Sequence, residues 1–224
     1  MFSKLWNFNS SRFRLEKEMR IFANRVQKGA LVLDAGSGEA PYKNLFLHAR
    51  YESADFCKVD KRYEPSTYIC DLADIPVENC RYDFVIFNQV MEHLPEPSKV
   101  LLELHRVLKE GGCMFASAPF FFEEHEQPYD FFRYTQFAWR KILTEAGFEI
   151  EKLDWLEGYY GTLGYQFSMM SRLPKWKFLP FRIFARLFSL LFHWLETKQK
   201  LKIGLPKNYF VIAFKPKETQ PCLE

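Results

Sequence analysis

The chain has 224 residues, of which 48% are apolar and 26% charged, and its formal net charge is +3. This composition excludes a disordered chain and collagen-like order. The length suits a single globular domain, residues 1–224, with a sizeable core. Aromatic residues reach 18%, so the chain has more apolar surface to place, in a core or against an apolar partner, than most domains have.

Positive charge is concentrated near the carboxyl end of the chain. The segment 171–207 contains nine Lys or Arg residues and one acidic residue, Glu196, so it carries +8 and, given the total of +3, leaves the remainder at −5. A mildly acidic body with one strongly basic segment brings two partners into consideration, an anionic membrane surface and nucleic acid.

Cysteine usage and the apolar runs indicate the compartment. The five Cys residues form no C-x-x-C pair, which argues against a disulfide framework or a zinc site and favours a reducing compartment. The first residues lack the continuous apolar stretch of a signal peptide. The longest apolar run, Leu187–Leu195, is too short to span a bilayer. We therefore expect a cytoplasmic protein, one that could sit peripherally at the inner face of the membrane.

Short apolar runs alternate with helical patterns along most of the chain. A helix is expected over 12–27, and a second over 97–109, with Gly111 and Gly112 as its stop. A third helix is expected to begin after Thr135 as its N-cap. This alternation predicts a doubly wound α/β fold with a mostly parallel, seven-stranded sheet. The expected strands are 30–38, 51–56, 66–72, 82–90, 113–120, 148–156 and 209–215.

The segment 157–207 interrupts this alternation and predicts a helical insertion before the last strand. Residues 181–200 have helical periodicity, with a wide apolar face and one narrow polar stripe that includes Arg182, Arg186 and His193. Such a helix is typical of membrane interfaces, with its cations toward anionic headgroups. The alternative is a helix that covers the sheet or caps the active site of an ordinary enzyme.

A glycine turn follows the first predicted strand. Gly36 and Gly38 stand directly after Asp34, and Pro41 suits the first position of a following helix, whose N-terminus would face a ligand. The dinucleotide-binding fingerprint requires a third glycine at the position of Pro41, so NAD and FAD are disfavoured as ligands of this turn. Asp55, at the end of the second strand, can accept both hydroxyls of a ribose.

Two further positions extend this predicted nucleoside site. Asp71 follows the third strand and could accept from an exocyclic amine, while Leu72 could pack on an adenine face. Asn88 ends the fourth strand and is expected across the crevice from Gly36.

These motifs resemble the class I S-adenosylmethionine-dependent methyltransferases, type-11 group. The resemblance is carried by VLDAGSGEAPY, by Asp55, by the run ICDLADIPVENCRYDFVIFNQVMEHLPEPSKVLLELHRVLKEGG, and by EHEQPYDFFRYT and ILTEAGF. It covers about residues 25–150 and the last strand, and implies a Rossmann-like methyltransferase fold with S-adenosylmethionine as cofactor. It also implies that the glycine turn holds the methionine end of the cofactor, that the strand-two acid binds ribose, and that the Asp-Leu pair flanks adenine. Those roles fall on Asp34, Gly36, Gly38, Asp55, Asp71 and Leu72.

The catalytic candidates are two histidines. His93 follows the fourth strand, and His125 lies in the aromatic loop 119–134, which is the expected wall or lid over the acceptor. A hydroxyl acceptor profits from a general base, and His125 is the first candidate for it. The alternative is that both histidines only pack. No metal site is predicted, although His125 with Glu123 and Glu126 forms a weak candidate cluster.

Three functions are compatible with the sequence. The first is methyl transfer to a small-molecule acceptor, glycan-type or lipid-linked; relatives with the pattern H-x-x-P-x-D-x-x-R-Y-T, here starting at His125, resemble enzymes of polysaccharide or lipid-linked biosynthesis. The second is a non-catalytic cofactor-binding or membrane-adaptor module, against which the intact glycine turn and Asp55 argue. The third is a nucleic-acid methyltransferase, disfavoured because Asn88–Met91 lacks the N/D-P-P-Y/F motif and because the basic segment carries a wide apolar face.

Overall fold

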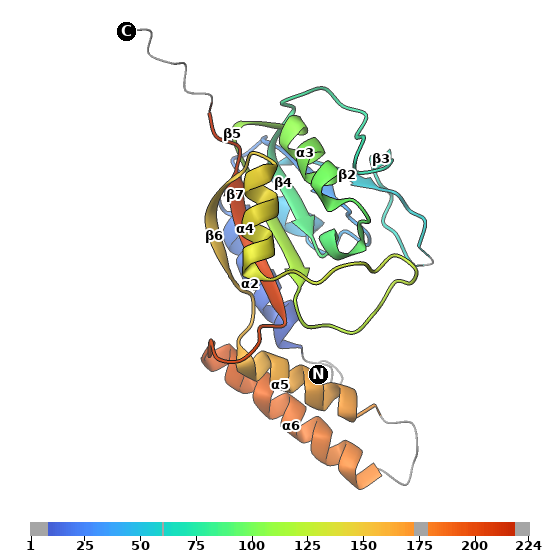
Figure 1. Ribbon diagram of the computed structural model, residues 1–224, viewed down its shortest axis with the longest axis vertical. Coiled ribbons are helices and arrows are strands. Elements are labelled where there is room, and N and C mark those ends of the chain that lie inside the picture. The colour runs from blue at the N-terminus through green and yellow to red at the C-terminus, as the bar shows by residue number, and fades with distance from the viewer. Residues whose placement is uncertain (1–8, 60, 173–178, 218–224) are drawn as a thin grey trace.

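The computed structural model describes residues 9–59, 61–172 and 179–217, and a seven-stranded sheet forms its centre (Figure 1). The strand order is β3-β2-β1-β4-β5-β7-β6, and all neighbouring strands from β3 to β5 are parallel. β7 runs antiparallel to both β5 and β6. The predicted mostly parallel sheet is thereby confirmed. The strands are β1 Leu31–Ala35, β2 Arg50–Asp55, β3 Tyr68–Ile69, β4 Tyr82–Asn88, β5 Leu108–Pro119, β6 Glu149–Trp155 and β7 Asn208–Phe214.

Helices cover both faces of this sheet. On one face, α2 (Ser10–Ala23) buries Met19 and Phe22 against side chains of β1, β4, β5 and β7. On the other face, α3 (Pro97–Val107) and α4 (Gln136–Glu145) bury their apolar sides, with Leu104 and Trp139 inaccessible to solvent. Each face therefore has its own apolar core, which is the doubly wound arrangement that the alternating sequence predicts.

Local signals explain where these helices begin. Asn9 caps α2 by accepting from the backbone N–H of Ser11 at 2.9 Å. Thr135 caps α4, as predicted, by accepting from the N–H of Ala138 at 3.2 Å. Pro97 occupies the first turn of α3, where backbone N–H groups have no partner within the helix, so its lack of an N–H costs no hydrogen bond.

Several predicted boundaries are wrong, and two of them change how the strands are connected. α3 ends at Val107, and β5 begins at once with Leu108, so Gly111 and Gly112 lie inside a strand and do not stop a helix. The β4–β5 register shifts between Tyr82 and Phe84, where β5 advances from Leu108 to Cys113 and so contains three extra residues. After the glycine turn, the expected helix is a single 3-10 turn, Lys43–Phe46, which begins after Tyr42 and does not include Pro41.

The insertion before β7 is a helical hairpin of α5 (Tyr159–Met170) and α6 (Leu179–Lys198), which projects from the end of the sheet (Figure 1). The sequence predicts α6 but not α5, whose glycines disfavour a helix. Those glycines allow close packing, since a Cβ on Gly164 would lie 2.7 Å from Nδ1 of His193. The buried carboxylate of Glu196 accepts from the N–H groups of Gly158 and Gly161 and so caps α5 from α6.

The orientation of α6 differs from the expected one. Its polar stripe faces the protein, where Arg186, Ser189, His193 and Glu196 are buried against α5 and α2. The prediction that Arg186 points toward headgroups is therefore wrong. The apolar side of the helix faces outward instead, and its exposed members are Leu179, Phe181, Ile183, Phe184, Leu187, Leu191 and Trp194. Of the helices in the described part of the chain, none is long and apolar enough to cross a membrane.

Candidate functional site

Two cavities meet at the carboxyl ends of the parallel strands. The first, of about 450 Å³, is bordered by the glycine turn after β1, the end of β2, the segment after β3 and the 3-10 turn Met91–His93 after β4. Its lining combines apolar side chains with a few acids, which suits a nucleoside. The lining residues are Gly36, Asp55, Phe56, Lys58, Lys61, Ile69, Cys70, Asp71, Leu72, Gln89, Val90, His93, Leu94, Pro95, Glu126 and Tyr129.

Asp55 is held rigidly at the edge of the first cavity. One carboxylate oxygen accepts from the N–H of Gly38 at 2.9 Å, and the other accepts from the N–H of Cys57 at 3.0 Å. Each oxygen keeps a lone pair for a further donor. A carboxylate fixed in this way, at the end of β2, fits the two hydroxyls of a ribose.

Gly36 is required by the backbone and by its neighbour. Its φ is +76°, a region that residues with a Cβ rarely adopt, and an added Cβ would lie 2.4 Å from a methyl carbon of Val90. A larger residue here would therefore displace Val90 from the wall of the first cavity as well as obstruct a ligand.

The remaining predicted cofactor residues divide between the two cavities and the interior. Asp71 and Leu72 line the first cavity, and the Asp71 carboxylate accepts from the N–H of Ala73 at 2.9 Å. Asp34 lies behind the wall, where it accepts from the Tyr51 hydroxyl; burial raises its pKa to about 6. Asn88 lines the second cavity rather than facing Gly36 across the first.

The second cavity, of about 530 Å³, opens between the end of β4, the start of α2 and the α5–α6 hairpin. Its lining is polar and strongly basic. The residues are Asn9, Ser11, Arg12, Leu15, Tyr42, Asn88, Gln89, Phe122, Glu123, Leu156, Tyr165, Ser168, Arg172, Arg186, His193, Lys207 and Asn208.

Gln89 lines both cavities and is the residue at their junction. Its φ is +55°, an unusual backbone conformation for a residue with a side chain. A chain of hydrogen bonds holds it there: its side-chain N–H donates to Ser117 Oγ at 2.9 Å, and that hydroxyl donates to Asn88 Oδ1 at 2.7 Å. Strained, over-determined residues of this kind cluster at functional sites.

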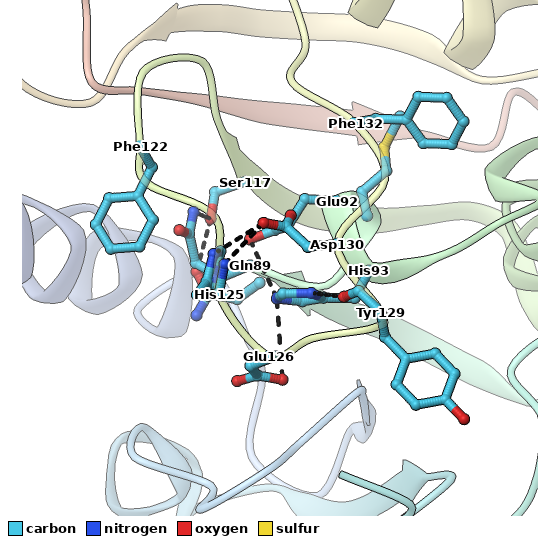
Figure 2. Close-up of polar contacts among 12 residues, drawn as sticks. Gln89, Glu92, His93, Ser117, Phe122, His125, Glu126, Tyr129, Asp130 and Phe132 are labelled. Carbon is cyan, nitrogen blue, oxygen red and sulfur yellow. Dashed lines mark hydrogen bonds and ion pairs between the residues drawn. The ribbon is translucent and has the colours of Figure 1, made fainter.

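The two candidate histidines lie together, with ring centroids 4.7 Å apart (Figure 2). Nδ1 of His93 faces the carbonyl oxygen of Tyr129, and Nδ1 of His125 faces that of Glu123 at 3.1 Å. A carbonyl only accepts, so each Nδ1 carries a proton, and the neutral ring of His93 presents a basic Nε2. Burial lowers the pKa of His93 and favours this neutral form. His93 lines the first cavity, whereas His125 stands behind it against Phe122.

Glu92 is a buried acid beside these rings that sequence reasoning missed. Its carboxyl is inaccessible to solvent and has no hydrogen-bond partner among the described residues. Burial raises its pKa to about 8, so the group is mostly protonated at neutral pH. Ligand atoms of Glu92, His93 and His125 all lie within 4.8 Å of one another, a grouping that differs from the Glu123–His125–Glu126 cluster considered from sequence.

Residues of the motif that starts at His125 hold the loop between β5 and α4 in place through hydrogen bonds and an ion pair. The Asp130 carboxylate accepts from the N–H of His125 at 2.9 Å and pairs with Arg133 at 2.6 Å. The hydrogen bond from Arg133 lowers the pKa of Asp130 to about 2. The Tyr134 hydroxyl donates to the carbonyl of Met91, which ties the loop to the turn that carries His93. Asp130 and Arg133 thus position His125 through contacts within the loop.

The family profile described as "Methyltransferase domain" matches residues 9–153, which include β1 to β5 and the whole of the first cavity. The chain therefore belongs to the S-adenosylmethionine-dependent methyltransferases of class I, and S-adenosylmethionine is its cofactor. The first cavity fits this cofactor, since the fixed carboxylate of Asp55 suits its ribose and the apolar wall suits its adenine.

Curated relatives match only parts of their own length. A ubiquinone biosynthesis O-methyltransferase of Marinobacter nauticus is 37% identical over 90 residues, which is 40% of this chain and 35% of the relative. A protein of Mycolicibacterium smegmatis assigned to the S-adenosylmethionine-dependent methyltransferases is 30% identical over 138 residues, 55% of this chain and 53% of the relative. The chain thus spans about a third to a half of the length of these relatives.

Solved structures share the fold at low identity. A 1,6-didemethyltoxoflavin-N1-methyltransferase of Burkholderia thailandensis superposes with a TM-score of 0.57 and 15% identity, covering 93% of this chain and 79% of that one. The cyclase SpnF superposes with a TM-score of 0.60 and 16% identity, covering 92% and 82%. A cyclase among these neighbours illustrates that the fold alone does not determine the reaction.

Proposed function

We propose that this protein transfers a methyl group from S-adenosylmethionine to a hydroxyl of a small lipid-linked or glycan-type acceptor bound in the second cavity. The observation that carries the proposal is the position of Gln89, which lines both the first cavity and the second. Methyl transfer needs the acceptor atom held in line with the methyl group, and two cavities sharing one wall residue supply that alignment.

The bound cofactor supplies an electrophilic methyl group on its sulfonium. The acceptor oxygen forms the new bond to that carbon as the carbon–sulfur bond breaks, and the electron pair of that bond stays on sulfur. The hydroxyl proton goes to Nε2 of His93, a residue that lines the first cavity. This nitrogen lies 3.8 Å from a Glu92 oxygen and 4.0 Å from a Glu126 oxygen, and the His125 ring meets the His93 ring edge-on. The name of the Marinobacter nauticus relative, an O-methyltransferase of ubiquinone biosynthesis, supports an oxygen acceptor on a lipid-linked molecule.

The proposal includes a membrane surface from which the acceptor is taken. The outward face of α6 is apolar along its length, with Leu187 55% and Trp194 53% exposed, and water is a poor environment for such a face. Exposed Lys198 follows it on the same helix. An apolar face with a lysine at its end fits an anionic bilayer, with the face in the acyl boundary and the cation at the headgroups.

The two other functions are less well supported. A non-catalytic module has no need of a second cavity joined to the cofactor site. A nucleic-acid methyltransferase would present the cations of 171–207 on an open surface, but Arg186 and Lys207 are buried in the second cavity, and Lys200 and Lys202 both pair with Asp154.

Transfer of a tritiated methyl group tests the reaction. Cell fractions separated into lipid, carbohydrate, protein and nucleic acid are incubated with the protein and labelled cofactor, and label is expected in the lipid or carbohydrate fraction. His93→Ala should lower the rate by about 10²–10⁴-fold, and His125→Ala by less, because it lies behind His93. Label in protein or nucleic acid only would refute the acceptor class, and an unchanged rate in His93→Ala would refute the base.

Sedimentation with vesicles of anionic lipid tests the membrane contact. The wild type should sediment with them, and the double variant Leu187→Glu/Trp194→Glu should stay in solution. Leu47→Glu is the matched control, because Leu47 is an exposed apolar residue outside α6. Failure of the wild type to sediment, together with a concentration-dependent dimer that the double variant abolishes, would assign the face to a second copy of the chain.

A further inference from the structure

The second cavity carries an excess of positive charge. Its lining contains four cationic side chains, Arg12, Arg172, Arg186 and Lys207, and one carboxylate, Glu123. His193 adds no charge at neutral pH, because burial lowers its pKa to about 4. Segments 1–8 and 173–178, adjacent in the chain to this lining and outside the described residues, contain no Asp or Glu that could neutralise it.

Lys207 is the most informative of these cations because it is only 5% exposed. Its ammonium group lies between two rings, 4.6 Å from the centroid of Phe122 and 4.4 Å from that of Tyr165, and it donates to Ser11 Oγ at 3.3 Å. In the described structure, no carboxylate oxygen lies within 4.0 Å of it. A buried cation is costly without a compensating anion, and cation–π contacts offset only part of that cost.

Neighbouring acids supply only part of the missing charge. Glu157 acts on Lys207 from behind the cavity, but it is fully buried, and burial raises its own pKa to about 7. Its oxygen accepts from the side-chain N–H of Asn208 at 2.8 Å, so it is turned toward Asn208. Glu123 contributes a single negative charge at the rim.

The cations also act on one another across this space. Burial is the main cause that lowers the pKa of Arg186 and that of Lys207. The positive charge of Arg172 lowers both further, and Arg12 also lowers that of Lys207. These cations come from segments far apart in the chain: α2, the residues after α5, α6 and the loop before β7. An anion placed among them would relieve the repulsion.

We infer that the acceptor carries a phosphate group, bound in the second cavity by Lys207, Arg172, Arg186 and Arg12. A multiply charged anion matches the three excess positive charges better than a single carboxylate would, and guanidinium groups suit phosphate geometry. This inference rests on the proposed function for the identity of the ligand as acceptor, but the anion site is testable without methyl transfer. A phosphate at one end of the acceptor would place its hydroxyl toward Gln89 and the cofactor.

Titration calorimetry with inorganic pyrophosphate tests the site directly, with chloride used to hold ionic strength constant. The wild type should bind the probe, and Lys207→Met should weaken binding at least tenfold. Arg172→Gln, at an exposed residue whose change should not affect folding, provides the second variant and should weaken binding several-fold. Arg140→Gln, an exposed arginine on α4 outside the cavity, is the matched control and should bind as the wild type does.

Separate measurements distinguish failure of the proposed function from failure of the anion site. S-Adenosylhomocysteine should bind the wild type and the cavity variants equally, and loss of that binding would count against the proposed function rather than the anion site. Absence of pyrophosphate binding, or equal binding in Lys207→Met, Arg172→Gln and the wild type, would overturn the inference. Comparison of a soluble phosphate monoester with phosphatidic acid vesicles identifies the source: a lipid phosphate should also require the apolar face of α6.

Discussion

Replacing Glu92 with Gln should change how the stability of the protein depends on pH. The Glu92 carboxyl is fully buried without a hydrogen-bond partner among the described residues, and burial raises its pKa from 4.5 to about 8. The folded state therefore keeps a proton that the unfolded state releases above pH 4.5. The contribution of Glu92 to stability therefore falls as pH rises from about 4.5 to about 8, because over that window this group binds fewer protons in the unfolded state than in the folded state.

The size of this effect follows from the two pKa values. The loss approaches about 1.4 kcal/mol per pH unit within the window, or about 2 to 3 kcal/mol between pH 5 and pH 7. The amide side chain in the Glu92→Gln variant has no proton to release, so the stability of that variant should be flatter over the same range. The buried amide adds a constant cost at every pH, and Glu157, whose pKa is also raised, contributes equally to both proteins.

Urea unfolding of wild type and Glu92→Gln at pH 5, 6 and 7 measures the difference. The variant should gain stability relative to the wild type as pH rises. Glu145→Gln, at an exposed position near the end of α4, is the control and should track the wild type. A difference between wild type and Glu92→Gln that stays constant from pH 5 to pH 7 would refute the assignment of a protonated carboxyl beside His93.

Three further outcomes are expected. Asp55→Ala removes a charged acceptor of two ribose hydrogen bonds, each worth about 1.5–3 kcal/mol. Calorimetry should show S-adenosylhomocysteine binding weakened at least about tenfold in this variant but unchanged in the control Asp74→Ala, and equal affinities in both would place ribose recognition at another residue. His93→Ala should leave that affinity within about threefold while it lowers turnover, so a large loss of binding would make His93 a structural residue. Gly164→Ala places a Cβ 2.7 Å from the His193 ring and should lower the free energy of unfolding by about 1–3 kcal/mol, measured as a melting temperature several degrees lower. An unchanged melting temperature would mean that α5 and α6 can move apart at this point without loss of stability.

Much of the fold could be predicted because it is encoded locally. Apolar runs alternate with helical periods, so the strands and their parallel arrangement follow from the pattern, and Thr135 marks the start of α4. The connection after the glycine turn is different. Ala40 takes a positive φ of 47° and the chain makes only a 3-10 turn before β2, and nothing in the composition of that segment distinguishes it from the start of a helix.

The direction in which α6 faces could not be predicted from its periodicity. A helical period shows that polar and apolar sides exist, but not which side meets the protein. The polar stripe is buried because its partners come from distant segments: Ser10 hydrogen-bonds His193, and the carbonyl of Gly164 accepts from Ser189. Ser10 lies on α2, just before the helix that the periodicity predicts over 12–27, and Gly164 lies on α5, which the sequence does not predict.

The candidate site was only partly visible in the sequence for the same reason. Asp55, Asp71 and Leu72 follow predicted strands, and the carboxyl ends of parallel strands share one edge of the sheet, so their grouping is foreseeable. Lys207 stands in a loop before β7 and looks like one more basic residue of 171–207. Its burial between Phe122 and Tyr165 depends on three segments meeting, which no local pattern reports.

The position of the cofactor sulfur tests the account most directly. A crystal structure of the protein with S-adenosylhomocysteine should show the ribose hydroxyls on the carboxylate of Asp55, the adenine against Leu72, and the sulfur beside Gln89, facing the second cavity. A ribose bound away from Asp55, or a sulfur that faces away from the second cavity, would contradict methyl transfer to an acceptor held there.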